Sequence, residues 1–238
     1  MNVIILAGAK TSDVGSYPPY LTEINHSPLI QTLSESLSVI EGARVIIPIN
    51  AGDDLKYNLR RSLEQISNKP TIIVCNETKG ALISALLCID EMNLDESLLV
   101  INGNEYIDCD FSAVVKKFAS TKSDLGIVCF DSIHPRYSHA VVTDNDVERI
   151  VFHAVEGGKA CTGLVWFKDA SVFFDSACKA VLKKSGSEAR FYFNEVVNQM
   201  ILDGRTAYAT EIDNRDYYPL KSSADLLSLR ELLRKDSL

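Results

Sequence analysis

A dense basic region is missing from this sequence. Its 238 residues include 24 Lys and Arg against 32 Asp and Glu, and the basic residues are scattered along a chain of net charge −8. A nucleic-acid surface needs a dense positive face, so the composition argues against nucleic acid as a partner. Small phosphorylated ligands remain compatible with it, because they need only one local positive pocket.

The sequence also lacks long apolar runs, an N-terminal signal peptide and clusters of cysteine. No run of about 18 apolar residues predicts a membrane span, and the apolar start is too short for a signal peptide. The six cysteines show no CxxC pairing and no ligand spacing with the four histidines. Most lie in apolar stretches such as TIIVC and GIVCF, which is typical of buried thiols in a reducing compartment. We therefore expect no Cys–His metal site, no membrane insertion and a cytoplasmic location.

Several catalytic motifs do not occur. The sequence has no G-x-S-x-G, no H-E-x-x-H and no G-x-x-x-x-G-K-[ST], and the loop after the first apolar run has no G-x-G-x-x-G. Hydrolase, metalloprotease, P-loop and dinucleotide-binding interpretations therefore lack support.

Apolar runs alternate with amphipathic segments in the first hundred residues. The apolar runs predict strands at 2–7, 43–49, 70–75 and 97–103. The segments between them predict helices at 29–40, 55–66 and 78–92, the last with Thr78 as its N-cap. Strands that are apolar throughout, rather than at alternate positions, indicate a parallel sheet covered by helices on both faces.

The strands come closer together after residue 103. Further strands are predicted at 125–130, 139–144, 147–153, 162–168 and 206–212, and further helices at 111–120, 169–184, 192–203 and 223–235. We interpret the chain as one domain, 1–238, with a nucleotide-binding half at 1–110 and an acceptor half at 111–238. The fold class is three-layer α/β/α with a mostly parallel central sheet and a mixed second half.

Two loops are expected at the ligand-binding edge of this sheet. In an open parallel sheet the ligand lies beyond the carboxyl ends of the strands, at the switch in strand order. The loop at 7–21 and the turn at 101–110 both leave the sheet at that edge. The loop keeps Gly8 among small residues, which lets the backbone pass close to a ligand. Acidic side chains in the turn are of the type that magnesium prefers.

Six blocks of the sequence occur in the order found in a known family. They are LAGAKT…SYPPYL, TKGALISALL, INGNEYIDCDF, SIHPRYSHAVV, RFYFNEVVNQMILDG and YYPLKSSADL. Together they resemble the sugar-phosphate nucleotidylyltransferases, especially the bacterial capsule and lipopolysaccharide subgroup, which have a glycosyltransferase-A-like fold. The resemblance implies that a sugar phosphate or similar phosphate attacks the α-phosphorus of a nucleoside triphosphate. Pyrophosphate is then released, with Mg²⁺ as the cofactor.

The resemblance also implies where the ligands bind. Nucleotide binding is expected at Leu6, Ala7, Gly8, Ala9, Lys79, Gly80, Asn102 and Gly103. Acceptor binding is expected at Asn104, Glu105, Arg136, Tyr137, Glu195 and Asn198. Purely structural roles stay open for some of these residues. Lys79 would then be a surface lysine and Tyr137 would pack on the sheet. Glu195 and Asn198 would be a surface pair one helical turn apart.

The charged positions of the family are changed in this chain. The loop arginine is absent, and the nearest basic residue is Lys10, a point charge without arginine's bidentate fork. The lysine of the P-K-P-L motif falls at Pro19. The aspartate that holds the metal falls at Asn104, and a second metal aspartate falls near Pro219, with Asp216 close to it. Each lost charge removes transition-state stabilisation from a phosphoryl-transfer site.

Neighbouring carboxylates are the expected compensation. We assign catalysis to Lys10, Asp108 and Asp110, and the magnesium ion to Asp108 and Asp110, with Asp13 and Asp216 next in line. The alternative is that Asp108 and Asp110 are turn and cap residues that begin the helix at 111–120.

Three functions are compatible with these observations. The first is nucleotidyl transfer to a sugar phosphate or similar phosphate in surface-polysaccharide precursor synthesis, by a chain that forms a homo-oligomer or acts alone. The second is a catalytically silent family member that binds a nucleotide or sugar phosphate, or serves as a partner subunit. The third is a glycosyltransferase that uses Asp108-Cys109-Asp110 as a D-x-D metal motif. The loop at 7–21 lacks the arginine and the lysine that the family has there. We therefore expect it to bind a nucleoside but to hold the β- and γ-phosphates poorly.

Overall fold

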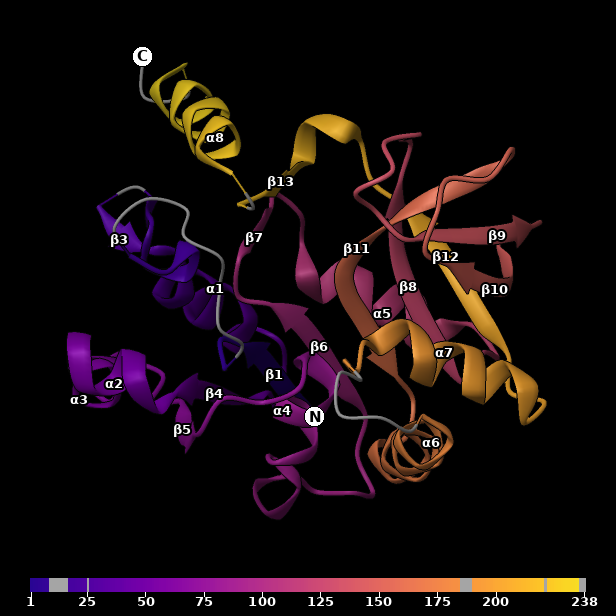
Figure 1. Ribbon diagram of the computed structural model, residues 1–238, viewed down its shortest axis with the longest axis horizontal. Helices are drawn as coiled ribbons and strands as arrows, with labels where there is room; N and C mark the ends of the chain where they lie inside the picture. Colours follow the sequence, from indigo (N-terminus) through magenta and orange to yellow (C-terminus); the bar gives the residue numbers. More distant parts are fainter. Residues whose placement is uncertain (9–16, 25, 185–189, 221, 236–238) are drawn as a thin grey trace.

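The structure is a computed structural model that describes residues 1–8, 17–24, 26–184, 190–220 and 222–235 (Figure 1). Its centre is a nine-stranded sheet in the order β5-β4-β1-β6-β11-β8-β12-β10-β9. Within the described part of the chain, no helix is both long and apolar enough to cross a bilayer.

The first four strands of that order are parallel. They are β5 (Thr71–Cys75), β4 (Arg44–Asn50), β1 (Asn2–Leu6) and β6 (Leu98–Asn102). The helices that connect them are α1 (Leu29–Ser38), α2 (Ala51–Tyr57), α3 (Leu59–Leu63) and α4 (Ala81–Leu86). Continuous apolar sequence suits these strands, because helices cover both faces of the sheet and leave no solvent side. The predicted parallel half is therefore confirmed.

The remaining strands form a mixed half, as predicted. They are β8 (Leu125–Phe130), β9 (His139–Thr143), β10 (Asp146–Val151), β11 (Gly158–Phe167) and β12 (Ala207–Glu211). Strand β11 is antiparallel to both β6 and β8, so it joins the two halves into one sheet. The helices are α5 (Phe111–Ser120), α6 (Ala170–Lys183), α7 (Phe193–Leu202) and α8 (Ser223–Lys235).

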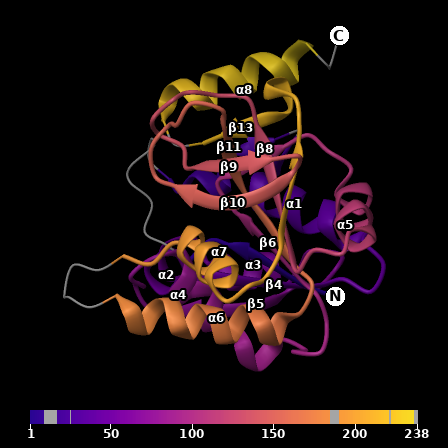
Figure 2. The same cartoon turned by 90° about the vertical axis from the view of Figure 1, so that its right-hand side faces the viewer.

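Residues on the two faces of the sheet belong to two separate apolar cores. Along β1, Val3 and Ile5 pack with α1 and α5, whereas Ile4 packs with α4, α6 and α7. Successive side chains of a strand point to opposite faces, so a fully apolar strand supplies both cores. Figure 2 shows α6 and α8 at opposite ends of the molecule, with the sheet between them. This arrangement is the predicted three-layer α/β/α fold.

Two predicted helices differ from the structure. The helix predicted at 55–66 is divided at Asn58, whose φ of 54° lies in the left-handed region. The helix predicted at 78–92 starts at Ala81 and ends at Leu86, and its N-cap is Gly80 rather than Thr78. The Thr78 hydroxyl instead lies 2.7 Å from the Ser84 hydroxyl. The reason is tertiary: Gly80 pairs with a distant segment, as described below.

A small two-stranded sheet was not predicted. Strands β7 (Glu105–Ile107) and β13 (Tyr217–Pro219) pair antiparallel, with Glu105 opposite Pro219. Three-residue strands have too little local pattern to be seen in a sequence. A second short pair joins β2 (Glu23–Ile24) and β3 (Ser27–Pro28).

Candidate functional site

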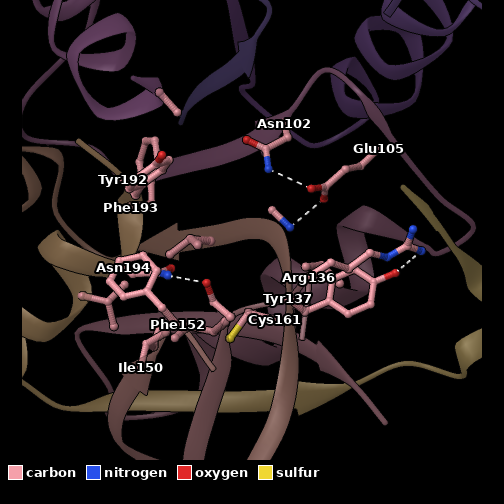
Figure 3. Close-up of a pocket in the computed structure, with 17 residues that line it drawn as sticks. Asn102, Glu105, Arg136, Tyr137, Ile150, Phe152, Cys161, Tyr192, Phe193 and Asn194 are labelled. Carbon is pink, nitrogen blue, oxygen red and sulfur yellow. Dashed lines mark hydrogen bonds between the residues drawn. The ribbon is translucent and has the colours of Figure 1, made fainter. Parts of the chain in front are cut away.

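A cavity of about 360 Å³ lies where the two halves of the sheet meet (Figure 3). Its volume is within the range of small-molecule sites. The first half of the chain contributes Ala81, Asn102 and Glu105 to its wall. The second half contributes Arg136, Tyr137, Ser138, Phe152, Cys161, Thr162, Gly163, Tyr192, Phe193, Asn194 and several aliphatic residues. Four residues predicted from the sequence, at 102, 105, 136 and 137, therefore share one cavity.

Among the described residues, the most deeply buried polar side chain of the cavity wall is Glu105. It is only 1% exposed. The Asn102 amide donates to its Oε1 at 2.8 Å, and the Gly163 backbone N–H donates to its Oε2 at 2.6 Å. A Cβ at Gly163 would lie 2.0 Å from Asn102 Nδ2 and 2.7 Å from Glu105 Oε2. Only glycine fits there, because this strand backbone must reach the carboxylate directly.

Arg136 and Tyr137 occupy the other end of the cavity. The Arg136 guanidinium lies 4.8 Å from the centroid of the Tyr137 ring, and its Nη1 donates to Asp225 Oδ1 at 3.0 Å. The Tyr137 ring packs edge-on against Phe130, with centroids 4.9 Å apart. Burial raises the pKa of Tyr137 above its ordinary value. The charge of Arg136 thus already has a protein partner.

The predicted phosphate loop begins beside this cavity. The Gly103 N–H donates to the Leu6 carbonyl at 2.9 Å, and Ala7 forms a bridge with Ile49. A Cβ at Gly8 would lie 3.0 Å from Cys75 Sγ and 3.2 Å from Ser84 Oγ, so the backbone there runs close to β5 and α4. The predicted residues Ala9, Lys10 and Asp13 lie outside the described residues.

A second hollow adjoins the first across the segment that contains Lys79 and Gly80. Residues 73–79 line it, together with Ile83, Leu87 and Phe191. The Phe191 N–H donates to the Lys79 carbonyl at 2.8 Å, and the Leu82 N–H donates to the Phe191 carbonyl at 3.3 Å. Gly80 has a φ of +127°, and its Cβ would lie 2.3 Å from the Phe191 oxygen. This backbone pairing holds the two hollows side by side.

Comparison with known proteins settles the family. Residues 11–212, well over half of the chain, match the model of the nucleotidyl transferase family. The chain belongs to this family. None of the curated proteins searched matches the sequence.

Solved structures share the fold of this nucleotidyl transferase chain at low identity. The nucleoside-diphosphate-sugar pyrophosphorylase of Vibrio cholerae RC9 is 17% identical with a TM-score of 0.79, over 97% of this chain and 100% of that one. The CTP:phosphocholine cytidylyltransferase of Streptococcus pneumoniae is 19% identical with a TM-score of 0.75, over 98% of both chains. The inositol-1-phosphate CTP transferase of T. maritima is 19% identical with a TM-score of 0.72, over 98% of this chain and 95% of that one.

The two positions at which the resemblance predicts metal aspartates, Asn104 and Pro219, lie in neighbouring segments of this nucleotidyl transferase chain. The Leu220 N–H donates to the Asn104 carbonyl at 2.8 Å, beside the pairing of β7 with β13. Asn104 is neutral and Pro219 has no polar side chain. Pro19, at the motif lysine, is buried in a short 3₁₀ turn. The tertiary structure therefore brings the segments at Asn104 and Pro219 together, and neither of these two residues carries a charge.

Asp108 and Asp110 do not form a metal site in the described residues. The Asp110 carboxylate accepts from the Ala113 N–H at 3.0 Å and so caps α5. Burial first, and then the charges of Asp108, Asp110 and Asp216, raise the pKa of the Cys109 thiol between them to about 12. Within the described residues no three His, Cys, Asp or Glu side chains are grouped to hold a metal ion. The assignment of magnesium to Asp108 and Asp110 therefore stays a prediction, because one or two carboxylates can hold this ion together with substrate phosphates.

Glu195 and Asn198 lie outside the cavity wall. The Glu195 carboxylate pairs with the Lys184 ammonium and accepts from the Tyr192 N–H. The Asn198 amide accepts from the Ile150 N–H at 2.7 Å and donates to the Ile150 carbonyl at 2.8 Å. These contacts attach α7 to β10, so they orient the cavity wall rather than line it.

Sequence reasoning missed several residues that line the cavity. Asn194, next to Glu195, donates to Ser138 Oγ at 2.6 Å across the cavity wall. Gly163 in TGLVWF had a usable signal, because a glycine inside an apolar strand often marks a close backbone approach. Phe152 and Tyr192 had none, since exposed aromatic residues follow no local pattern.

Proposed function

We propose that this protein transfers a nucleotidyl group from a nucleoside triphosphate to a phosphorylated small molecule. One observation carries the proposal. In a chain of the nucleotidyl transferase family, Lys79 and Phe191 line one hollow, and the residues that follow them closely, Ala81 and Tyr192, line another together with Glu105. Two neighbouring sites are what a two-substrate transfer requires, because the reacting groups must be held in contact.

The transfer is an in-line displacement at phosphorus. An oxygen of the acceptor phosphate attacks the α-phosphorus, the bond from that phosphorus to the bridging oxygen breaks, and pyrophosphate leaves with the electron pair. The protein contributes mainly position and charge. In this proposal the nucleotide binds along the backbone at Gly8 and Gly103, and the acceptor binds in the cavity beside Glu105. The resemblance of the six sequence blocks supports a role in making surface-polysaccharide precursors, and the cysteines in apolar stretches support a cytoplasmic location.

Binding without turnover is the second candidate. It is favoured by the resemblance of the sequence blocks, which assigns the family's charged positions to the uncharged residues Pro19, Asn104 and Pro219. No contact favours the glycosyltransferase interpretation, because Asp108 and Asp110 line neither hollow.

A two-part experiment separates these candidates. Purified protein is incubated with each of the four common nucleoside triphosphates and with a panel of sugar 1-phosphates and phosphoalcohols, with and without Mg²⁺, and pyrophosphate release is measured. Binding of each triphosphate is measured by calorimetry in parallel. Release that depends on the acceptor supports transfer, binding without release supports the silent member, and the lack of both contradicts both.

A matched pair of variants ties any release to the cavity. Asn194→Ala removes a side chain from the cavity wall, whereas Asn214→Ala removes one that only accepts from the Asp131 N–H. We expect the first to raise KM for the acceptor severalfold and the second to leave it unchanged. Equal effects would show that the acceptor binds elsewhere.

A further inference from the structure

The cavity wall carries an unbalanced negative charge. Among the described residues that line it, Glu105 and Arg136 are the only Asp, Glu, Lys or Arg side chains. Arg136 is neutralised by Asp225, at 3.0 Å, in a pair that faces partly toward solvent. Within the described residues, no Lys, Arg or His forms an ion pair with Glu105. The described part of the wall therefore presents one carboxylate without a counter-charge.

This carboxylate is held in a fixed position. Glu105 is 1% exposed, and N–H donors from Asn102 and Gly163 hold its two oxygens at 2.8 and 2.6 Å. A buried carboxylate without a cation is costly, and two N–H donors offset only part of that cost. Each carboxylate oxygen accepts up to two hydrogen bonds, so the two N–H donors do not exhaust the capacity of Glu105. The negative charge of Glu105 also acts on the buried Tyr217 hydroxyl, whose pKa is raised first by burial and then by that charge.

Aromatic rings stand at the same cavity. Phe152 and Tyr192 are 48% and 42% exposed, which is unusual for side chains of this size. Their ring centroids lie 6.0 Å apart at an interplanar angle of 68°, so one ring meets the edge of the other (Figure 3). Tyr137 and Phe193 also line the wall. The faces of such rings attract cations, and quaternary ammonium groups above all.

We propose that the acceptor carries an ammonium or quaternary ammonium group, with Glu105 as its counter-charge and Phe152 and Tyr192 as its aromatic wall. This inference names the substrate class of the acceptor cavity and so rests on the function proposed above. It assigns the phosphate of the acceptor to the side of Gly8 and the cationic end to the cavity. A neutral sugar phosphate would leave the Glu105 charge uncompensated.

The test compares ligands that differ only in the cation. Phosphocholine is compared with 3,3-dimethylbutyl phosphate, in which carbon replaces the quaternary nitrogen, and glucosamine 1-phosphate is compared with glucose 1-phosphate. Affinities are measured by calorimetry on the unmodified protein without nucleotide and in EDTA, so neither transfer nor a bound metal enters. We expect the cationic member of at least one pair to bind about tenfold more tightly or better. Equal affinities within both pairs would overturn the proposal.

Two variants locate the effect. Glu105→Gln should abolish the preference, whereas Phe152→Leu should reduce it severalfold. Leu55→Ala is the control, since Leu55 is 91% exposed on α2 and outside the cavity, and it should leave the preference unchanged. If Glu105→Gln does not fold, the affinity ratios within the two ligand pairs, and their reduction in Phe152→Leu, still test whether the cavity binds a cation. A preference that survives Glu105→Gln in a folded protein would contradict the assignment.

The two proposals fail in different ways. A preference for cations without pyrophosphate release would support this cavity assignment and contradict transfer. Release with neutral acceptors, together with equal affinities within both pairs, would support transfer and contradict the cationic acceptor.

Discussion

Gly80→Ala should both destabilise the protein and open its site. Gly80 has φ +127° and ψ 169°, a region of backbone space that is essentially limited to glycine. A side chain there costs about 1–3 kcal/mol in backbone strain. The new Cβ would also lie 2.3 Å from the Phe191 oxygen and 2.9 Å from the Phe191 nitrogen. Because these are backbone atoms, the segment at Phe191 must move.

That movement has a calculable consequence. It disrupts the hydrogen bonds from the Phe191 N–H to Lys79 and from the Leu82 N–H to Phe191, which measure 2.8 and 3.3 Å. Each contributes about 1 kcal/mol, so the total loss is about 3–5 kcal/mol. This is a large share of the roughly 5–15 kcal/mol by which ordinary domains are stable.

Gly157→Ala is the matched control. Gly157 also has a positive φ, +72°, but nothing lies within 4 Å of its Cβ position. Its substitution introduces backbone strain alone, of about 1–2 kcal/mol. Urea unfolding followed by circular dichroism gives both free energies of unfolding. Equal losses in the two variants would refute the argument that contact with Phe191, rather than backbone conformation, makes Gly80 necessary.

Three further predictions concern charge. Asn104→Asp restores a carboxylate beside β13 and should strengthen magnesium-dependent triphosphate binding by calorimetry, whereas Asn104→Ala should not; no gain would mean that this turn does not face the phosphates. Asp110→Ser keeps the cap of α5 and should preserve the free energy of unfolding, whereas Asp110→Ala should lower it by about 1 kcal/mol in urea unfolding. If the Asp110→Ser protein is stable but no longer releases pyrophosphate, that result would instead support a metal at this carboxylate. Burial and the 2.6 Å hydrogen bond to Asp53 raise the pKa of Tyr20 above its ordinary value of 10.0. Because only the unfolded chain then ionises near pH 10, stability should fall as the pH rises above 10, and Tyr20→Phe should flatten that fall while costing about 1 kcal/mol at neutral pH; an unchanged slope would contradict it.

Local pattern was sufficient for most of the fold. The strands β1, β4, β5 and β6 were predictable because each must supply apolar side chains to two cores, which leaves a continuous apolar run in the sequence. The β9–β10 hairpin was predictable because its turn needs residues that tolerate positive φ, and Asp144 and Asn145 have φ of 51° and 71°. The cap at Asp110, one of two interpretations of that residue, likewise depends on a hydrogen bond three residues away.

The candidate site was predictable only in part. The six sequence blocks that resemble the family predicted Asn102, Glu105, Arg136 and Tyr137 as site residues, and these four residues line one cavity. The sequence did not show that Arg136 would be paired with Asp225, 89 residues further along the chain. Nor did it show that the segment at Asn104 would lie beside the segment at Pro219, because that depends on the pairing of β7 with β13.

By itself the sequence determined which segments are strands and helices, and which family charges are missing, because both are properties of short stretches. Only the tertiary structure decided that Gly163 would reach Glu105, 58 residues away, and that Gly80 would lie against Phe191 and stand at the cap of α4 in place of Thr78. Such contacts join segments whose approach is set by the packing of the whole sheet. The residues of one short stretch do not reveal which distant segment will pack against them.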